Sequence, residues 1–391
     1  MKNFLLLALC AAALPVAAQS AGAPKSEPLA NPSGSGSLQP SWSVTQDGSP
    51  LLSWIEKAGD GSYTLKYAIH KGSAWTEPRT VAAGRKFFRH PAEVPEVITL
   101  PDGTFMAHWI ETPKEESDAE FAYVSASKDG VKWTTPVLAH KDRSQVQHGL
   151  ASMAATGEHE ASLIWLEALH GEDAPVAMKR TIVSSAGAVV KEEVLDPDVC
   201  GCCPTTIVKT SRGLLIAYRT HTKADIRDIG TIRYEGGKWT PMKILNADNW
   251  KIDACPTNAA AVSAKGERVA ISWFTEGQDN PRTQLALSTD GGVTFGKPVL
   301  VSTGHSYGYT SVALDSAGGA TVSWLEDAGS DAAVLVRHVS AAGVPGPVLK
   351  IAHGSKQSLG YPKLLETGSG AWIAWGNGSA GAKVQTARVT N

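Results

Sequence analysis

Several features are scarce in this chain of 391 residues. Its charges nearly balance, with 36 Lys and Arg against 38 Asp and Glu. The balance gives no electrostatic reason to expect nucleic acid or an anionic membrane surface as a partner. Beyond the N-terminal stretch there is no uninterrupted apolar run long enough to span a membrane. Methionine is rare, with 5 residues, which argues against a methionine-lined copper-trafficking surface.

Cysteine is also rare, and one of the 5 cysteines lies in a predicted leader. Lys2 and the short apolar stretch 4–16, followed by small residues, predict a signal peptide over 1–18 with cleavage near Ala18. The bulky Leu9 and the short lead argue against a lipoprotein cleavage site at Cys10. The mature chain, 19–391, is therefore expected to be one periplasmic or secreted domain.

An aromatic residue that ends an apolar run returns about every fifty residues. Around it each unit has four short segments rich in Val, Ile and aromatics, separated by Gly- and Pro-containing turns. Seven such units predict an all-β, seven-bladed β-propeller, with a six-bladed ring as the alternative. The repeated residues are Trp54, Trp109, Trp165, Tyr218, Trp273, Trp324 and Trp375.

The seventh unit ends after its third strand, at 383–389. The segment 25–32 resembles the fourth-strand segment of the first unit. We therefore expect an N-terminal strand to complete the last blade and close the ring, which would remove exposed sheet edges.

Cysteine and histidine gather in the loops that lead into the first strands of consecutive units. In a propeller these loops surround the central axis at one face. Soft thiolates and an imidazole there suit copper or zinc, but two disulfides or a redox-active pair fit an oxidising compartment as well. The candidate ligands are Cys200, Cys202, Cys203, Cys255 and His148, with His90, His221 and His305 also on this rim.

The turn in the fifth unit carries Ser288, Asp290, Gly292 and Phe295 in the spacing S-x-D-x-G-x-x-F. This motif resembles the Asp-box of the sialidase superfamily, in which Asp and Ser hold a tight turn, Gly allows a positive φ and the aromatic plugs the sheet. The Asp-box supports the propeller class and says little about catalysis.

Four further motifs make the whole mature chain resemble the exported bacterial branch of sialidase-like Asp-box proteins. They are H-x-D followed by x-H-G (140–149), C-x-C-C (200–203), Y-R with I-R-D-I (218–229), and W with C-P-x-N (250–258). The resemblance implies an arginine triad on a substrate carboxylate, a Tyr–Glu nucleophile pair and an Asp acid/base. The residues that could fill these roles are Arg89, Arg219 and Arg227 for the triad, Tyr309 or Tyr361 with Glu111 or Glu167 for the nucleophile pair, and Asp228.

Two functions follow from these observations. The first is an envelope binding or assembly protein with a Cys/His cluster at the axial mouth, which holds either a metal or disulfides. The second is an exo-sialidase-type glycoside hydrolase that acts on terminal acidic sugars. The partner would be an envelope protein or a glycan, neither identified by the sequence.

Overall fold

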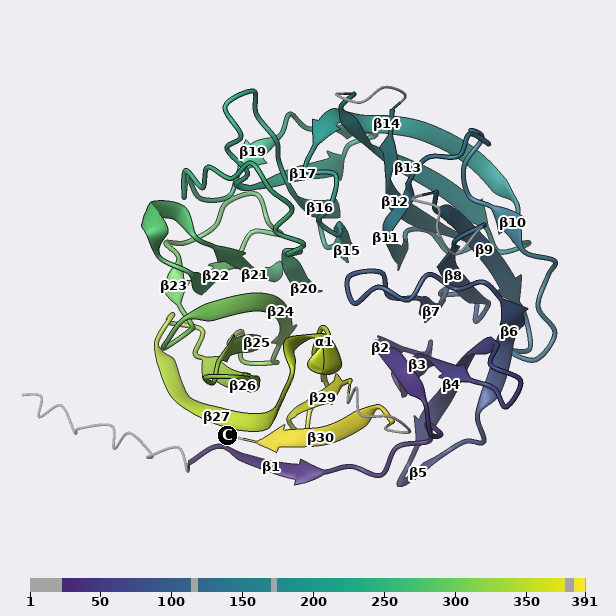
Figure 1. The fold of residues 1–391 in the computed structure, drawn as a ribbon, viewed down its shortest axis with the longest axis horizontal. Helices are drawn as coiled ribbons and strands as arrows, with labels where there is room; N and C mark the ends of the chain where they lie inside the picture. The colour runs from purple at the N-terminus through teal and green to yellow at the C-terminus, as the bar shows by residue number, and fades with distance from the viewer. Residues whose placement is uncertain (1–22, 114–118, 170–173, 377–382, 391) are drawn as a thin grey trace, which may run out of the picture.

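The chain forms seven antiparallel sheets arranged as blades around one axis (Figure 1). This computed structural model describes residues 23–113, 119–169, 174–376 and 383–390, so the predicted signal peptide and Cys10 lie outside the described residues. The predicted seven-bladed propeller is confirmed. The six-bladed alternative is wrong, because each of the seven aromatic-ended segments lies in a sheet of its own.

The first three blades follow the chain from β2 to β14. The first contains β2 (Ser37–Val44), β3 (Pro50–Lys57), β4 (Tyr63–Lys71), β5 (Ala74–Trp75) and β6 (Arg79–Arg85). The second contains β7 (Glu96–Thr99), β8 (Phe105–Glu111), β9 (Phe121–Ser127) and β10 (Val137–Leu138). The third contains β11 (His148–Ala155), β12 (Glu160–Ala168), β13 (Val176–Ser184) and β14 (Val189–Val199).

The next three blades run from β15 to β27. The fourth contains β15 (Thr206–Thr210), β16 (Gly213–Arg219), β17 (Ile229–Glu235), β18 (Lys238–Trp239) and β19 (Lys243–Ile244). The fifth contains β20 (Ala261–Lys265), β21 (Arg268–Thr275), the 3-10 turn η1 (Gly277–Asp279), β22 (Arg282–Ser288) and β23 (Val299–Leu300). The sixth contains β24 (Ser306–Leu314), β25 (Ala320–Asp327), β26 (Ala332–Val339) and β27 (Pro345–Gly354).

The seventh blade joins the two ends of the chain. It follows the short helix α1 (Lys356–Leu359) and contains β28 (Lys363–Glu366), β29 (Ala371–Trp375), β30 (Gln385–Thr390) and β1 (Lys25–Pro28). β1 pairs antiparallel with β30, as Figure 1 shows, and the side chain of Asn31 donates to the carbonyl of Val384 at 3.0 Å. The expected closure by an N-terminal strand is confirmed.

The second strand of each blade is enclosed by the neighbouring blades, and it reads as a continuous apolar run for that reason. In β25, for example, every residue but the last is buried. The seven repeated aromatic residues lie at or near the ends of these strands, and we call them the ring aromatics. Most of them donate a hydrogen bond to a buried or half-buried carboxylate. The pairs are Trp54–Glu56, Trp109–Glu111, Tyr218–Asp196, Trp273–Asp248 and Trp324–Glu326, at 2.6 to 2.9 Å.

The Asp-box forms the turn between β22 and β23. Asp290 accepts from the backbone N–H of Val293 and of Thr294, both at 3.0 Å, and Ser288 Oγ accepts from the N–H of Gly292 at 3.0 Å. Gly292 has φ +79°, a conformation that favours glycine, and Phe295 packs against the core beside it. The motif is thus a turn-forming device. Among the described residues, no helix has the length and apolarity needed to cross a bilayer.

Candidate functional site

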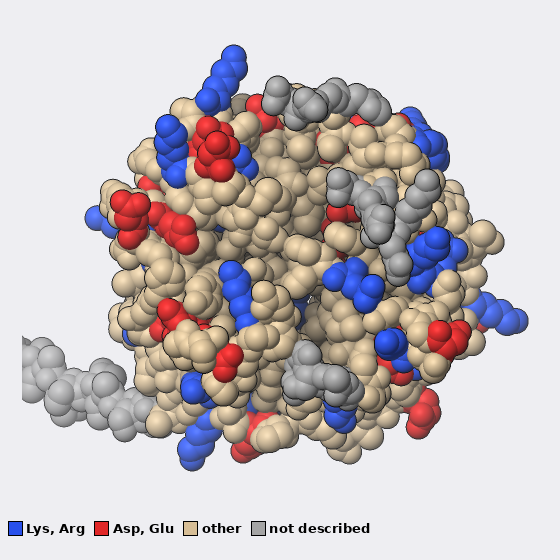
Figure 2. Space-filling view, in the orientation of Figure 1, with Lys and Arg blue, Asp and Glu red and all other residues tan. Residues whose placement is uncertain are grey.

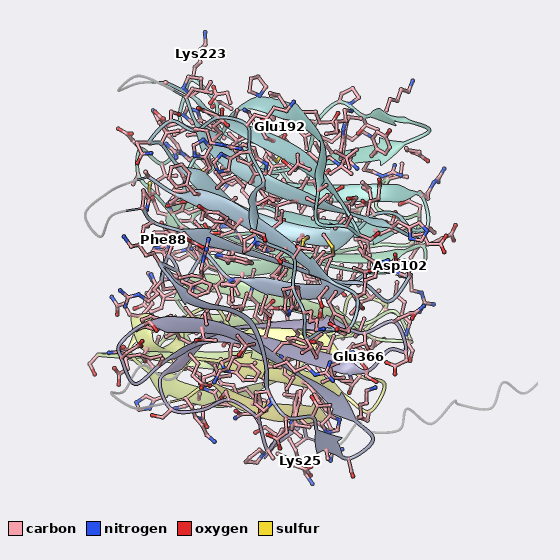
Figure 3. All side chains as sticks on the ribbon, turned by 90° about the vertical axis from the view of Figure 1, so that its right-hand side faces the viewer. Lys25, Phe88, Asp102, Glu192, Lys223 and Glu366 are labelled. Atoms are coloured by element: carbon pink, nitrogen blue, oxygen red, sulfur yellow. The ribbon has the colours of Figure 1, made fainter. Side chains whose placement is uncertain are left out.

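The first strands of the blades contact one another in a ring around the axis, so the loops that lead into them converge. The ends of the second strands lie on the same face, since the sheets are antiparallel. In Figure 3, Phe88 in the loop before β7 lies on one side of the disc, and Asp102 in the turn after β7 and Glu366 at the end of β28 lie on the other. We call the face with Phe88 the mouth face. It is hollowed at its centre, with basic and acidic residues interspersed (Figure 2).

Three thiols lie together in the loop between β14 and β15. Cys200 Sγ is 3.7 Å from Cys202 Sγ and 3.5 Å from Cys203 Sγ. Cys200 and Cys203 are buried, whereas Cys202 is half-buried. A disulfide has a sulfur–sulfur length of about 2.05 Å, and the four described cysteines are free. We call this group the thiol cluster.

The loop that carries the thiol cluster is fixed by its neighbours. The backbone N–H of Cys200 donates to the carbonyl of Arg219 at 3.1 Å, which joins the loop to the end of β16. Gly201 lies so close to β13 that a Cβ there would be 2.5 Å from a methyl carbon of Val176. Glycine is therefore required between the first two cysteines. The backbone N–H of Asn258 donates to Cys203 Sγ at 3.4 Å, from the loop before β20.

The electrostatics of the cluster favour a single thiolate. Contacts with the sulfurs of Cys202 and Cys203, and then Arg227, whose Nη1 donates to Cys200 Sγ at 3.4 Å, lower the pKa of Cys200. The contact with Cys200 raises the pKa of Cys202, and burial raises the pKa of Cys203. The neighbouring sulfurs and the guanidinium of Arg227 thus favour the thiolate form of Cys200.

Cys255 is exposed and stands outside the group of three. It shares with Cys202 the lining of a cavity of about 780 Å³ on the mouth face. Arg227, His90 and Glu120 also line this cavity. The thiol of Cys255 therefore lies on the mouth face with the other three, but it is not part of the group of three that lies within metal-ligand distance.

His148 does not join the thiol cluster, contrary to the expectation from sequence. It is the first residue of β11 and is fully buried, where its Nδ1 meets the carbonyl oxygen of Glu120 at 3.0 Å. This contact turns Nε2 toward Asp142 and Glu167, and the three residues form a second group of possible metal ligands. In the sequence, Asp142 and His148 belong to the same motif (140–149), but nothing there assigns Asp142 and Glu167 to one site with His148.

Of the three candidate arginines, only Arg227 reaches the cavity. Arg219 is 1% exposed and donates to the backbone carbonyls of Arg227 at 2.7 Å, Phe274 at 2.9 Å and Asn258 at 3.3 Å. The guanidinium nitrogens of Arg219 thus bind backbone carbonyls of the protein itself and are not directed at a substrate. Arg89 is exposed and lies over the ring of Tyr63, 4.9 Å from its centroid. The arginines do not form the triad that the resemblance implies.

The other catalytic candidates also have structural partners. Glu111 accepts from Trp109 and from Arg85, each at 2.6 Å. Asp228 is buried and accepts from two backbone N–H groups of the loop before β20, at 3.0 and 3.1 Å. Burial raises the pKa of Tyr309, which makes its phenol a poor nucleophile.

The three rim histidines have different surroundings. His90 lines the cavity and stacks on Phe88, and burial lowers its pKa. His221 contacts Asp198 at 2.8 Å, and this hydrogen bond raises its pKa. His305 is exposed beside Tyr307.

Sequence reasoning missed Glu93, which lies behind the cavity. It is buried, and one carboxylate oxygen accepts from the N–H of Ala151 at 3.2 Å. Burial and then the charge of Glu120 raise its pKa well above the usual value. No motif marks Glu93, because its raised pKa results from its burial and from its position near Glu120 in the folded chain.

Comparison with known proteins gives a family and a fold. The family model for the BNR repeat-like domain matches residues 56–372. No curated protein matches the sequence. A PL25 ulvan lyase structure is similar, with 9% identity, TM-score 0.55, and coverage of 93% of this chain and 98% of that one.

Two further structures are glycoside hydrolases by their titles. The α-L-arabinofuranosidase arb93a of Fusarium graminearum has 12% identity, TM-score 0.50, and coverage of 91% and 93%. The NanB sialidase of Streptococcus pneumoniae has 11% identity, TM-score 0.48, and coverage of 89% and 84%. At these identities the likeness concerns the fold alone. The chain belongs to the BNR repeat-like family and folds as a seven-bladed β-propeller.

Proposed function

We propose that this chain is an exported metal-binding protein, whose thiol cluster holds a thiophilic ion, Cu⁺ or Zn²⁺, at the axial mouth. The observation that carries the proposal is the sulfur spacing of 3.5 and 3.7 Å from Cys200 to Cys203 and Cys202. Sulfurs bound to one Zn²⁺ at about 2.3 Å in a tetrahedron are separated by about 3.8 Å. The three thiols thus stand close to the spacing that one ion requires.

The surroundings of the cluster support this function. Arg227 offsets part of the negative charge that three thiolates would bring into a buried loop. The half-buried Cys202 and the exposed Cys255 both face the cavity, so an ion or a partner could reach the site from the mouth. Thiolates in this arrangement suit Cu⁺ and Zn²⁺ over harder ions. The partner would be an envelope protein or glycan bound at the cavity, and the predicted signal peptide would deliver the chain to the periplasm.

The test is metal binding by the full mature chain, purified without oxygen. We expect one Cu⁺ in competition with bathocuproine disulfonate, or one Zn²⁺ against a chromogenic chelator. Cys200→Ser should weaken binding about tenfold or more, because it removes the central sulfur. Cys255→Ser is the matched control, since Cys255 lies outside the group, and it should weaken binding less.

Intact mass before and after reduction separates the metal site from its main rival. A metal site leaves the thiols of the metal-free protein reduced and open to alkylation after unfolding. Protein exported to the periplasm that shows a disulfide among Cys200, Cys202 and Cys203, and binds neither ion after reduction, would overturn the proposal.

A glycoside hydrolase of the sialidase type is the second candidate, because Arg227 and Glu120 line a cavity large enough for a sugar. It predicts release of a fluorophore from a sialoside, lost in Arg227→Ala and retained in Arg89→Ala. No turnover of any terminal acidic sugar by the metal-loaded or metal-free protein would remove this candidate.

A further inference from the structure

The third blade departs from the repeat at its ring aromatic. Trp165 donates to the neutral hydroxyl of Thr181 at 3.0 Å, whereas five other ring aromatics donate to a carboxylate. Its carboxylate, Glu167, occupies the position of Glu326 in the sixth blade, two residues after the aromatic. Glu167 is therefore released from the role that Glu326 performs, and its two carboxylate oxygens accept from Lys179 Nζ at 2.7 and 2.8 Å instead.

Glu167 faces a histidine, whereas the corresponding glutamates of blades one and six each face a serine. In the strand register His148 is opposite Glu167, while Ser306 is opposite Glu326 and Ser37 is opposite Glu56. Asp142, in the loop before β11, completes the group, and one ligand atom from each of the three residues lies within 4.8 Å of the others. Blade three thus carries an imidazole and two carboxylates where blades one and six carry a serine and one carboxylate.

The imidazole of His148 presents a lone pair to these carboxylates. A carbonyl oxygen can only accept, so the contact of Nδ1 with the carbonyl of Glu120 places the ring proton on Nδ1. In the neutral ring Nε2 then carries the lone pair. Nε2 is buried and has no hydrogen-bond partner among the described residues. A backbone carbonyl on the distal nitrogen is also the usual way in which a metal-binding histidine is oriented.

The distances leave room for an ion between these groups. His148 Nε2 is 3.8 Å from Asp142 Oδ2 and 3.9 Å from Glu167 Oε2, both too long for hydrogen bonds. Two ligands about 2.1 Å from one ion are separated by about 3.0 Å at a right angle and about 4.2 Å in line. Both distances fall within that interval.

We propose that His148, Asp142 and Glu167 form a second metal site, which binds a divalent cation that accepts nitrogen and oxygen donors, such as Zn²⁺ or Mn²⁺. The site differs from the thiol cluster in donor type and does not depend on it. The side chain of Asp142 is 32% exposed and provides the way in for the ion. Lys179 Nζ lies 2.7 Å from Glu167 Oε1 and 2.8 Å from Oε2, so it offsets the charge of that carboxylate and orients it, and each oxygen keeps a further lone pair for an ion.

Mn²⁺ is the probe of choice because it prefers oxygen and nitrogen to thiolate. We would titrate the metal-free mature chain with Mn²⁺ and follow the free ion by electron paramagnetic resonance. The wild type and Cys200→Ser should each bind one Mn²⁺ with equal affinity. Asp142→Asn and His148→Gln should each weaken binding about tenfold or more. Zn²⁺ should displace the bound Mn²⁺.

The experiment needs a control variant and a test variant that is expected to fold. Glu326→Gln changes the corresponding carboxylate in blade six and should leave Mn²⁺ affinity unchanged. Asp142→Asn alters a half-buried loop residue, so it keeps the test valid if the buried His148→Gln variant fails to fold. Equal Mn²⁺ affinity in the wild type and Asp142→Asn, or no binding of Mn²⁺ or Zn²⁺ by the wild type, would overturn the proposal. The gap would then hold only water.

Discussion

Replacing Arg219 by methionine distinguishes a structural arginine from one that binds substrate. Arg219 donates to the carbonyls of Arg227, Phe274 and Asn258, and its guanidinium lies 4.8 Å from the ring centroid of Trp250. It therefore joins the fourth blade to the long loop after β16 and to the fifth blade. Methionine has a similar length and fills the space, but it leaves the three carbonyls without this donor.

The cost follows from those contacts. A buried group that loses its hydrogen-bond partner costs about 1–3 kcal/mol, and the two shorter bonds, at 2.7 and 2.9 Å, should dominate. Methionine is uncharged, so the variant avoids the free-energy cost of burying the guanidinium, and this gain offsets part of the loss. We expect Arg219→Met to lower the free energy of unfolding by about 3 kcal/mol.

The assay is urea unfolding followed by tryptophan fluorescence, with Arg89→Met as the matched control. Arg89 is exposed, so its replacement should change the unfolding free energy by less than about 1 kcal/mol. If Arg219→Met costs less than about 1 kcal/mol and abolishes binding of an acidic sugar, Arg219 serves a ligand and the structural reasoning is refuted.

Three further predictions concern the turns and the ring closure. Asp290→Ala removes the acceptor for two backbone N–H groups of the Asp-box, and it should lower the unfolding free energy by about 1–3 kcal/mol while the metal content measured by mass spectrometry stays the same. The hydrogen bond with Asp102 raises the pKa of His159. The stability that this hydrogen bond adds to the folded protein is therefore present below the pKa of His159 in the unfolded chain, and it is lost as pH rises through the pKa in the folded chain. An NMR titration should show a lower His159 pKa in Asp102→Asn. Deleting 23–31 exposes the edge of β30, and light scattering should show faster aggregation than in the full mature chain.

The blades could be predicted because their information is local and repeated. An apolar segment that ends in an aromatic residue, followed by a turn, recurs often enough to define seven units. The seventh unit lacks a fourth strand, and the segment 25–32 could be identified as the strand that completes it because it resembles the fourth strand of the first unit. Position within the repeat also placed Cys200, Cys202 and Cys203 on the mouth face.

Side-chain direction at the mouth could not be predicted, because contacts between blades decide it. Arg219 ends β16 and Arg227 lies in the loop that follows, yet the carbonyls of Phe274 and Asn258 in the next blade fix only Arg219. The carbonyl of Glu120, on the second blade, turns His148 away from the thiols. All three acceptors are backbone carbonyls, so no residue type in the sequence could reveal these contacts.

Repetition also provides an internal reference for function. Where a ring aromatic donates to a carboxylate, as in Trp54–Glu56 and Trp324–Glu326, that carboxylate serves the blade. In the third blade Trp165 relies on a hydroxyl, and Glu167 turns to Lys179 and His148. The next loop along the chain carries the thiol cluster. Both proposed metal sites thus occur where neighbouring units depart from the pattern, and a departure that keeps the fold while bringing metal-ligand atoms together is more informative about function than the pattern itself.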